Sequence, residues 1–372
     1  MRGLSLDAGT GPLTLGGGSS GARSVTHRPV VERSRVWYLR AELEQGRHLI
    51  ATVDTSLDFA VIGAGRLGAS MALALRARGA SLLGFTAGSP AGRTRAETWL
   101  GGRASDGPAE LVALAPRLFV IAVPDQNLPA VAADLGARLA TSPPAAVTGH
   151  IGPTVVAHTS GATSVEVLAP CMQAGATALA FHPLQTFSDP STGSGRFTEA
   201  AVAITPAASQ ADRSGADFGF ALARLLGARP FLLPDHKRSL YHAAAAFACN
   251  YLVTLEHHAE TLFVESGLPR EQALSLFLPL VKTTLDNVAT LGTVHALTGP
   301  LSRGDADTIN RHLDALRTDA PHLLGVYRAL GLATLAILRL RGEMDPPMID
   351  ELSSLLSASD ELSSPLSDGL GA

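Results

Sequence analysis

Three glycines at a fixed spacing constrain the fold of this chain more than any other feature. Gly63, Gly65 and Gly68 follow the short apolar run Asp58–Ile62 directly, in a G-x-G-x-x-G pattern. Between a strand and a helix, the first glycine makes the tight turn, the second lets the backbone approach a pyrophosphate, and the third lets helix and strand pack closely. The pattern predicts a Rossmann-type dinucleotide site, the alternative being a glycine turn that binds nothing. The expected cofactor-binding residues of this loop are Gly63, Ala64, Gly65, Arg66, Leu67 and Gly68.

Apolar runs of strand length alternate with helical patterns after this loop. We expect strands at Asp58–Ile62, Ser81–Phe85, Leu118–Val123, Thr154–His158, Ala176–Phe181, Val202–Thr205 and Pro230–Leu233. We expect helices between several of them, at Leu67–Arg78, Leu128–Leu139, Ser164–Gln173 and Ala211–Leu226. Continuous apolar strands that alternate with helices are typical of a parallel sheet covered on both faces.

The pattern changes after Pro234, where only helices are expected. We predict helices at Lys237–Ser266, Pro269–Leu291, Asp305–Leu316 and Ala320–Arg341. The predicted fold class is therefore α/β: a Rossmann-type, mostly parallel sheet domain over residues 57–234, followed by an all-α substrate and dimerisation domain over residues 235–345. Residues 1–56 lack a sustained period and read as a disordered extension or an early start codon, and residues 346–372 read as a loose tail rather than a short amphipathic helix.

Composition excludes several classes of protein. The 372 residues are 46% hydrophobic and 17% charged, so the chain can bury a sizeable core. The net charge is -4, so no basic excess suggests that the protein binds nucleic acid or an anionic membrane. Two cysteines cannot make a disulfide framework, which favours a reducing cytoplasm. We find no uninterrupted run of about eighteen apolar residues and no compact apolar leader, so we expect a soluble cytoplasmic protein with no membrane span and no metal.

The segment after the second expected strand indicates which dinucleotide binds. An NAD site usually has an acidic residue about twenty positions beyond the third glycine, for the ribose hydroxyls. Here the segment holds Thr86, Gly88, Ser89, Arg93 and Arg95, and the next acidic residue is Glu97. Small hydroxyls and arginine suit a 2′-phosphate, so Ser89 and Arg93 are expected to bind NADP, and NAD is the less favoured cofactor. The alternative is that the arginines are solvated charges on a short helix.

Polar residues follow three further strands at the edge where the nicotinamide half should lie. Val123 and Pro124 are expected to contact the cofactor, whereas Asp125 is expected to cap the next helix. Ser160 is a candidate for substrate binding. His182 could orient a substrate oxygen or carry a proton, and a structural histidine held ahead of Pro183 is an equal alternative.

At this point the sequence resembles a known family, the Rossmann-like oxidoreductases whose C-terminal part is catalogued as domain of unknown function 2520. They belong to the wider 6-phosphogluconate dehydrogenase-like group, with 3-hydroxyisobutyrate and prephenate dehydrogenases and ketopantoate reductase. The resemblance covers about residues 57–330, and Ser142–Pro153 is longer than it implies, which suggests a surface loop. The matching pieces are Gly63–Gly68, His158–Gly161, His182–Phe187, Tyr241–Ala245, Asn250, Thr298–Pro300 and Arg303–Asp305.

The resemblance implies a lysine and an asparagine on the first long helix after the sheet, where they handle the substrate oxygen. Lys237 and Asn250 are the candidates, but Tyr241 occupies the position four after Lys237, which puts the role of Lys237 in doubt. Helical geometry instead groups His242 and Asn250 on one face, in a stripe with Ser239, Ala246, Cys249 and Val253. Such a polar pair on a buried helix fits a substrate site better than its alternative, a pair that holds two helices together.

The loop between the later helices adds two candidates for substrate binding. Arg303, close to Thr298, could grip a carboxylate with two hydrogen bonds, and a solvent-exposed arginine is an equal alternative. Asp305 is expected to cap the next helix. In the wider group the C-terminal helices often come from a dimer partner, so the resemblance implies a homodimer through the helical domain.

These observations predict an oxidoreductase that moves hydride between NADP and a small carboxylate-bearing oxo, hydroxy or imino compound. A 2-oxo acid of ketopantoate type fits the resemblance. The expected catalytic residues are His182, Lys237, His242 and Asn250. The alternative is an NADP-binding sensor or assembly protein without turnover.

Overall fold

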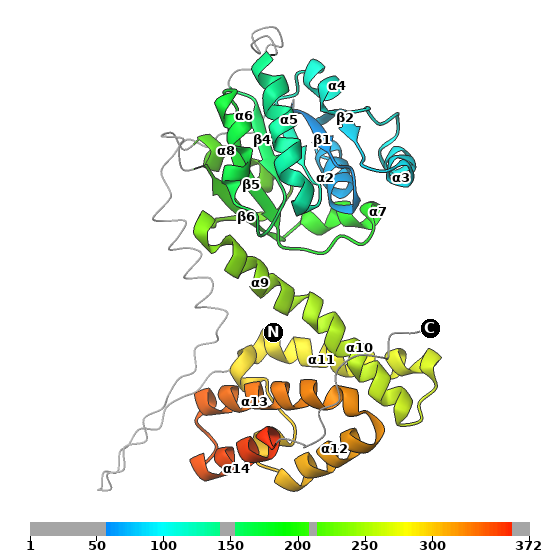
Figure 1. The fold of residues 1–372 in the computed structure, drawn as a ribbon, viewed down its shortest axis with the longest axis vertical. Coiled ribbons are helices and arrows are strands. Elements are labelled where there is room, and N and C mark those ends of the chain that lie inside the picture. The colour runs from blue at the N-terminus through cyan, green and yellow to red at the C-terminus, as the bar shows by residue number, and fades with distance from the viewer. Residues whose placement is uncertain (1–56, 142–152, 208–213, 359–372) are drawn as a thin grey trace, which may run out of the picture. The chain divides into compact units, whose positions relative to one another are not determined.

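The computed structural model describes residues 57–141, 153–207 and 214–358 (Figure 1). Among these residues the chain forms two compact units, of which the first ends at Gly267 and the second begins at Leu268. The predicted domain boundary at residue 235 coincides with the end of the sheet. The compact unit that contains the sheet continues beyond it and ends at Gly267. The extension predicted over residues 1–56 and nearly all of the loop predicted at Ser142–Pro153 lie outside the described residues.

The first unit is built on a seven-stranded sheet with the order β2-β1-β3-β4-β5-β6-β7. All neighbouring strands are parallel except β5 and β6, so the predicted mostly parallel α/β class is confirmed. The strands are β1 (Asp58–Ile62), β2 (Ser81–Thr86), β3 (Leu118–Ile121), β4 (Val155–His158), β5 (Thr177–Pro183), β6 (Ala201–Pro206) and β7 (Arg229–Leu232). Because β1, β3, β4 and β5 run parallel, their carboxyl ends share one edge of the sheet.

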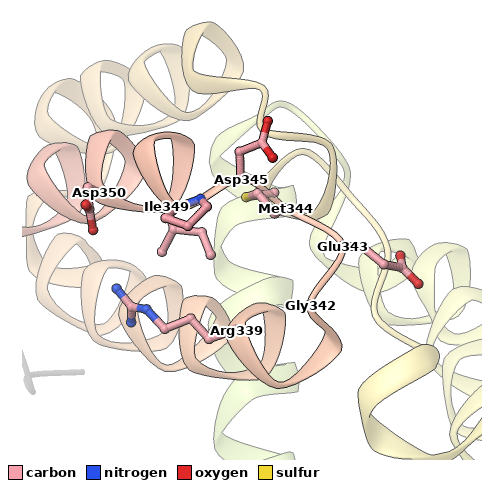
Figure 2. A pocket seen from close by; sticks show the side chains of 8 residues that line it. Arg339, Gly342, Glu343, Met344, Asp345, Ile349 and Asp350 are labelled. Carbon is pink, nitrogen blue, oxygen red and sulfur yellow. The ribbon is translucent and has the colours of Figure 1, made fainter.

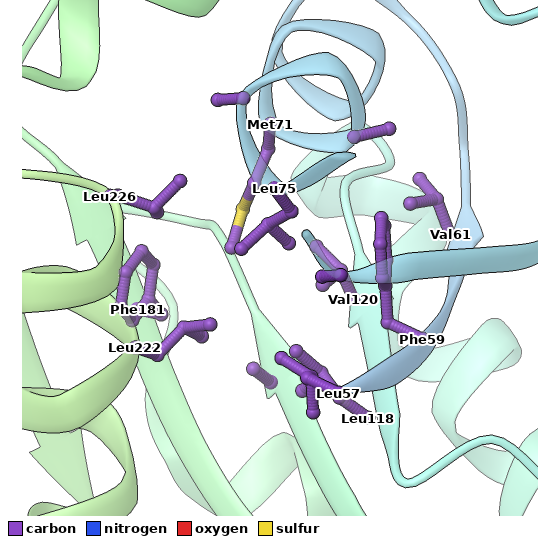
Figure 3. Close-up of a cluster of buried hydrophobic side chains, with 14 of the residues drawn as sticks. Leu57, Phe59, Val61, Met71, Leu75, Leu118, Val120, Phe181, Leu222 and Leu226 are labelled. Atoms are coloured by element: carbon purple, nitrogen blue, oxygen red, sulfur yellow. The ribbon is translucent and has the colours of Figure 1, made fainter. Parts of the chain in front are cut away.

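Helices cover both faces of the sheet because alternate strand residues point to opposite sides. Phe59 and Val61 of β1 join one core with Met71 and Leu75 of α2, and Leu222 of α8 closes that core (Figure 3). Ala60 and Ile62 point to the other core, beneath α4, α5 and α6. The helices of this unit's sheet region are α2 (Arg66–Arg76), α3 (Pro90–Leu100), α4 (Pro108–Ala113), α5 (Leu128–Thr141), α6 (Ala169–Gln173), α7 (Pro190–Gly193) and α8 (Ser214–Leu225), with 3-10 turns η1 (Asp125–Asn127), η3 (Val165–Leu168) and η4 (Ser194–Phe197).

The single helix predicted at Lys237–Ser266 is wrong in one respect, because it is two helices. After the 3-10 turn η5 (Asp235–Lys237), α9 (Arg238–Ala248) and α10 (Asn250–Glu265) meet at Cys249, whose backbone leaves the helical region (φ -126°, ψ -63°). No proline or glycine marks this position, so the apolar pattern runs through the break without a signal.

The second unit is all helical. It comprises α11 (Arg270–His295), η6 (Leu301–Arg303), α12 (Ala306–Asp319), η7 (Pro321–Leu323), α13 (Leu324–Arg341) and α14 (Pro346–Ser357). The helix predicted to end at Leu291 does change there, because Gly292 takes φ +78° and kinks α11. The predicted cap of α12 is confirmed, since the Asp305 carboxylate accepts hydrogen bonds from Thr308 N at 3.0 Å and Thr308 Oγ1 at 2.8 Å.

The loose tail predicted from residue 346 is wrong for its first twelve residues, which form α14. Ile349, Leu352 and Leu356 are buried and recur at helical spacing, so they give the helix an apolar face. Leu356 packs against Gly331 of α13, where there is no side chain in the way. A Cβ on Gly331 would lie 2.8 Å from Leu356 Cδ2. Residues 359–372 lie outside the described residues.

One helical segment, Pro321–Arg341, has the length and the mean hydropathy of 1.6 that a membrane span needs. It meets this criterion by length and composition alone, and Arg328 interrupts its apolar run. Leu335 and Leu338 of this helix are buried within the unit, and 28% of the apolar window is buried.

A shallow pocket lies between the end of α13 and the start of α14 (Figure 2). Its lining includes the charged residues Arg339, Glu343, Asp345 and Asp350 and the apolar Ile349. None of the residues that the sequence singled out as functional lines this pocket.

Candidate functional site

The glycine loop joins β1 to α2 as predicted. Gly63 takes φ +94°, which only glycine adopts readily, and a Cβ there would lie 2.7 Å from Ala122 O and from Val123 Cγ1. Gly68 packs equally closely, since a Cβ would lie 2.4 Å from Gly63 O. These two glycines shape the turn, and Val123 packs directly against it.

Gly65 differs from its neighbours because it faces open space. A Cβ on Gly65 would meet no atom within 4 Å, and the backbone there needs no positive φ. Gly65 is the N-cap of α2, and no side chain caps this helix. The first-turn N–H groups of α2, from Arg66 to Gly68, have no partner within the helix, so the loop can receive a phosphate.

Side chains and backbone groups of the segment after β2 make more hydrogen bonds to the rest of the unit than the sequence suggested. Thr86 holds the glycine loop, because its carbonyl accepts from Ala64 N at 2.7 Å. Ser89 caps α3 by accepting from Gly92 N at 3.1 Å. Arg93 is not merely solvated: it donates to Asp106 Oδ1 at 2.9 Å and Ala104 O at 3.1 Å. Contact of Ser89 and Arg93 with a 2′-phosphate stays a prediction.

Asp125, at the end of β3, does not act as the expected helix cap. Its carboxylate accepts a hydrogen bond of 2.8 Å from Ser160 Oγ, and η1 has no side-chain cap. Ser160 in turn accepts from Thr163 N at 3.0 Å and so closes the turn after β4. The carboxylate instead binds a hydroxyl in the loop after β4, a partner 35 residues away that the local sequence does not reveal.

Arg238, the first residue of α9, is the largest fully buried side chain and was missed by the sequence reasoning. It donates to Thr163 O at 2.6 Å, to Thr205 Oγ1 at 2.9 Å and to Ser160 O. Asp235, just before it, accepts from Ser164 Oγ at 2.6 Å and Val165 N at 2.9 Å. Both side chains fasten the start of α9 to the loop after β4. Nothing in the sequence distinguished Arg238 from the other arginines.

Two of the predicted catalytic residues meet at Gly161. The rings of His182 (β5) and His242 (α9) lie edge to face with centroids 5.8 Å apart. A Cβ on Gly161 would lie 2.8 Å from His182 Nε2 and 2.4 Å from His242 Nδ1, so both nitrogens face the same point. The hydroxyl of Tyr241 lies 2.9 Å from His182 Nδ1. We call His182, Tyr241 and His242, with Gly161, the imidazole cluster.

Burial keeps His182 neutral at ordinary pH. Burial, together with the nearby charges of His242 and Arg238, lowers the pKa of His182 to about 4, whereas Asp125 acts in the opposite direction. Burial likewise raises the pKa of Tyr241 to about 12, so this side chain is a phenol. The hydrogen bond to Tyr241 is compatible with both predicted roles of His182, as a structural histidine and as a residue that orients the substrate. Its ring nitrogens face a tyrosine and a second histidine.

His158, the last residue of β4, lies beneath the cluster and is fully buried. Neither of its ring nitrogens makes a hydrogen bond of good geometry to a described residue, although the Ser164 backbone lies close enough to favour the charged ring. Burial and the charge of Arg238 lower the pKa of His158 to about 3, against smaller opposite effects of Asp235 and the Ser164 backbone.

The other predicted residues do not join the cluster. Lys237 and Asn250 are exposed, and no contact links either side chain to the imidazole cluster within the part of the chain that the structure describes. The predicted stripe fails because the helix breaks at Cys249 and because α9 is mostly exposed, not buried. Thr298 and Arg303 are exposed residues of the second unit, so their contact with a substrate stays a prediction.

The comparisons with known families agree with this architecture. Residues 47–183 match the family described as Rossmann-like domain, and residues 205–334 match the Domain of unknown function (DUF2520). In this order, a Rossmann-like segment is followed by a DUF2520 segment. The resemblance inferred from the motifs is therefore confirmed. No curated protein matches the sequence.

Solved structures share the fold. A protein from Bacteroides fragilis, provisionally described as an NADP oxidoreductase, is 24% identical, with a TM-score of 0.58 over 75% of this chain and 98% of its own. A Thermotoga maritima protein is 20% identical, with a TM-score of 0.54 over 77% of this chain and 100% of its own. A 1-pyrroline-5-carboxylate reductase from Streptococcus pyogenes is 16% identical, with a TM-score of 0.50 over 81% and 100%. At these identities the likeness establishes the fold alone.

Proposed function

We propose that this protein is an NADP-dependent oxidoreductase that moves hydride to or from a small carboxylate-bearing oxo, hydroxy or imino compound. One observation carries the proposal: an open, uncapped glycine loop and the imidazole cluster occupy the same edge of one sheet. The loop follows β1 and His182 lies at the end of β5, three strand spacings away, or about 14 Å. A dinucleotide whose pyrophosphate lies on the loop extends across the switch point between β1 and β3 toward the cluster.

The cofactor would supply the hydride, and the protein would bind and polarise the substrate. His182 Nε2 and His242 Nδ1 face a common point, so a substrate oxygen or nitrogen near Gly161 could receive a hydrogen bond as negative charge develops on it. His242 is exposed and can exchange protons with solvent, which the buried His182 cannot do as readily.

NADP rather than NAD is favoured by the segment after β2. No acidic residue stands between Thr86 and Arg95, whereas exposed Ser89 and the α3 N-terminus are available to a 2′-phosphate. Arg93 would have to share its guanidinium with Asp106, and exposed Arg66 offers a second cation at the start of α2. The Bacteroides relative described as an NADP oxidoreductase supports the same cofactor.

The substrate class follows from the resemblance and from two unassigned groups. Thr298 and Arg303 provide a hydroxyl and a guanidinium that could hold a carboxylate. A 2-oxo acid of ketopantoate type is the first candidate, and the reductase from Streptococcus pyogenes, named for 1-pyrroline-5-carboxylate, makes a cyclic imino acid the second. Ser160 is less suited to bind a substrate, because Asp125 and Thr163 already engage its hydroxyl.

Turnover of NADPH tests the proposal. The full chain is incubated with NADPH and a panel of 2-oxo acids, with and without ammonium, and with cyclic imino acids. We expect oxidation of NADPH with at least one member and a loss of about a hundredfold in kcat for His182→Ala. An Asn310→Ala variant is the control, because Asn310 is an exposed residue of α12 to which no role is assigned. Micromolar binding of NADPH without any turnover would support the alternative, a sensor or assembly protein.

The exposed apolar side chains of the helices after the sheet favour a homodimer. Leu240 and Phe247 of α9 are 70% and 72% exposed, Val253 of α10 is 67% exposed, and Leu280 of α11 is 66% exposed. Exposure on this scale is unusual for a monomer and suits a surface that a second copy covers. We propose a homodimer through these helices, in which Thr298 and Arg303 could complete the partner's site. Sedimentation analysis tests it, and a monomer at micromolar concentration would contradict it.

A cytoplasmic location remains part of the proposal. Cys171 and Cys249 are both free, as expected of a protein that folds under reducing conditions. No group of His, Cys, Asp and Glu that could hold a metal ion occurs among the described residues.

A further inference from the structure

The environment of His182 is asymmetric, and this asymmetry bears on how the proposed reaction would be promoted. Its Nδ1 lies 2.9 Å from the Tyr241 hydroxyl, while its Nε2 faces Gly161 and the ring of His242. The two rings that touch it, from Tyr241 and His242, both stand edge to face, with centroids 5.5 Å and 5.8 Å away. His182 is thus held by a hydrogen bond at Nδ1, whereas its Nε2 is left to face Gly161.

The hydrogen bond between Tyr241 and His182 has a preferred direction. An imidazole lone pair accepts a hydrogen bond more readily than a phenol oxygen does, and a neutral histidine has one such lone pair. The phenol keeps its proton, because burial raises the pKa of Tyr241 to about 12, so it has a hydrogen to donate. A tyrosine that donates to Nδ1 leaves the proton of the neutral ring on Nε2.

We propose that Tyr241 is a positioning residue, which fixes His182 as the neutral tautomer with its proton on Nε2. His182 then donates a hydrogen bond to the substrate oxygen or nitrogen and does not release a proton to it. This inference rests on the proposed function only for the identity of the group that accepts the bond. A neutral imidazole can serve as an electrophile in this way, since it stabilises developing charge without itself carrying one.

The groups around His182 keep it neutral. The titratable groups that act on it or contact it are Asp125 of η1, His158 of β4, and Arg238, Tyr241 and His242 of α9. Asp125 is the acidic one and favours the charged imidazole, but burial and the basic neighbours outweigh it. His242, being exposed, is the member of the cluster suited to exchange the proton that the reduced product needs.

A second tyrosine–histidine pair provides a matched control. Tyr327 Oη lies 2.8 Å from His312 Nδ1 in the second unit, and the rings are edge to face with centroids 5.9 Å apart. The Tyr327→Phe variant removes the same hydroxyl from the same kind of pair, away from the imidazole cluster. It should alter His312 and leave His182 unchanged.

The tautomer is measured directly from the ¹⁵N chemical shifts of the ring nitrogens in full-length, histidine-labelled protein. The chain has 12 histidines, so the signals of His182 are assigned by their loss in His182→Gln. We expect a neutral ring with the proton on Nε2 across the range from pH 5 to 8, in which an unperturbed histidine would titrate. Tyr241→Phe should mix the two tautomers. A charged ring at pH 7, or a proton on Nδ1, would overturn the proposal.

Kinetics provide the second readout. Tyr241→Phe should lower kcat about tenfold and leave the affinity for NADPH unchanged, because one neutral hydrogen bond is lost. A kcat equal to that of the native protein would overturn the positioning role. If no substrate is turned over by the native protein, the proposed function fails, and with it the substrate contact, whereas the ring shifts still decide whether Tyr241 sets the tautomer.

Discussion

The glycine loop and the imidazole cluster occupy one edge of the same sheet, but they are specified in different ways. The loop is a contiguous segment, Gly63–Gly68, and it offers backbone N–H groups. The cluster draws one residue each from the end of β5 and the loop after β4, and two from α9, and it offers side chains. Local sequence therefore defines the loop, whereas only the assembled fold defines the cluster. Substitutions should separate the two, because binding depends on the first and turnover on the second.

The largest expected effect is that of Gly65→Ala. The new methyl group meets no protein atom, so the fold should be unaffected, but it occupies the space in which the pyrophosphate approaches the backbone. Loss of two charge-assisted hydrogen bonds, at about 2 kcal/mol each, weakens NADPH binding about a thousandfold. Fluorescence titration with NADPH measures this.

Gly107→Ala is the matched control for that experiment. Gly107 is likewise an N-cap glycine without a side-chain cap, and a Cβ on it would meet nothing within 4 Å, but it precedes α4. Its NADPH affinity should equal that of the native protein. If Gly65→Ala also binds NADPH normally, the dinucleotide does not lie on the loop.

Gly161→Ala should produce the converse effect, with a loss of turnover and no loss of cofactor affinity. Its methyl group would come within 3 Å of both imidazoles, and because His242 is exposed it can swing aside at little cost in stability. Separation of the two rings should lower kcat about a hundredfold, the effect of removing one preorganised donor. Steady-state kinetics with the substrate found in the panel measure it.

Gly195→Ala, which places a methyl group in open space, controls for the loss of a glycine as such. An unchanged kcat in Gly161→Ala would mean that the close approach of the two imidazoles has no part in the reaction. A weakened affinity of Gly161→Ala for NADPH would instead mean that the imidazole cluster also contributes to cofactor binding, so that binding and turnover do not depend on separate parts of the site.

The same contrast explains what the sequence could predict. Strand periodicity placed all seven strands to within a few residues, since buried parallel strands are continuous apolar runs, and the G-x-G-x-x-G spacing placed the loop. His182 and His242 were found because each carries chemistry that stands out. The alignment of Asn250 with His242 was lost at Cys249, where no residue signals a break. Arg238 was missed because burial of an arginine depends on acceptors from distant elements, here Thr163 and Thr205.

The smallest expected effect is on stability and comes from substitution of His158. It tests whether this buried residue next to the cluster contributes charge or only packing. Burial lowers the pKa of His158 to about 3, from 6.5. Below pH 6.5 the unfolded chain therefore binds a proton that the folded protein refuses until about pH 3, so the free energy of unfolding falls as the pH falls through this window. By pH 5 the loss from this residue is about 2 kcal/mol.

His158→Leu should remove that part of the pH dependence and leave the stability at pH 7 equal or slightly higher, because the lost ring makes no hydrogen bond of good geometry to a described residue. Urea unfolding at pH 7 and pH 5 measures both, with His322→Leu, an exposed position, as the control. If the variant loses as much stability on acidification as the native protein, the buried ring is already paired with a group that accepts its proton. His158 would then be a charged side chain at this edge of the sheet. It would have to be counted with the imidazole cluster when that cluster is compared with the glycine loop.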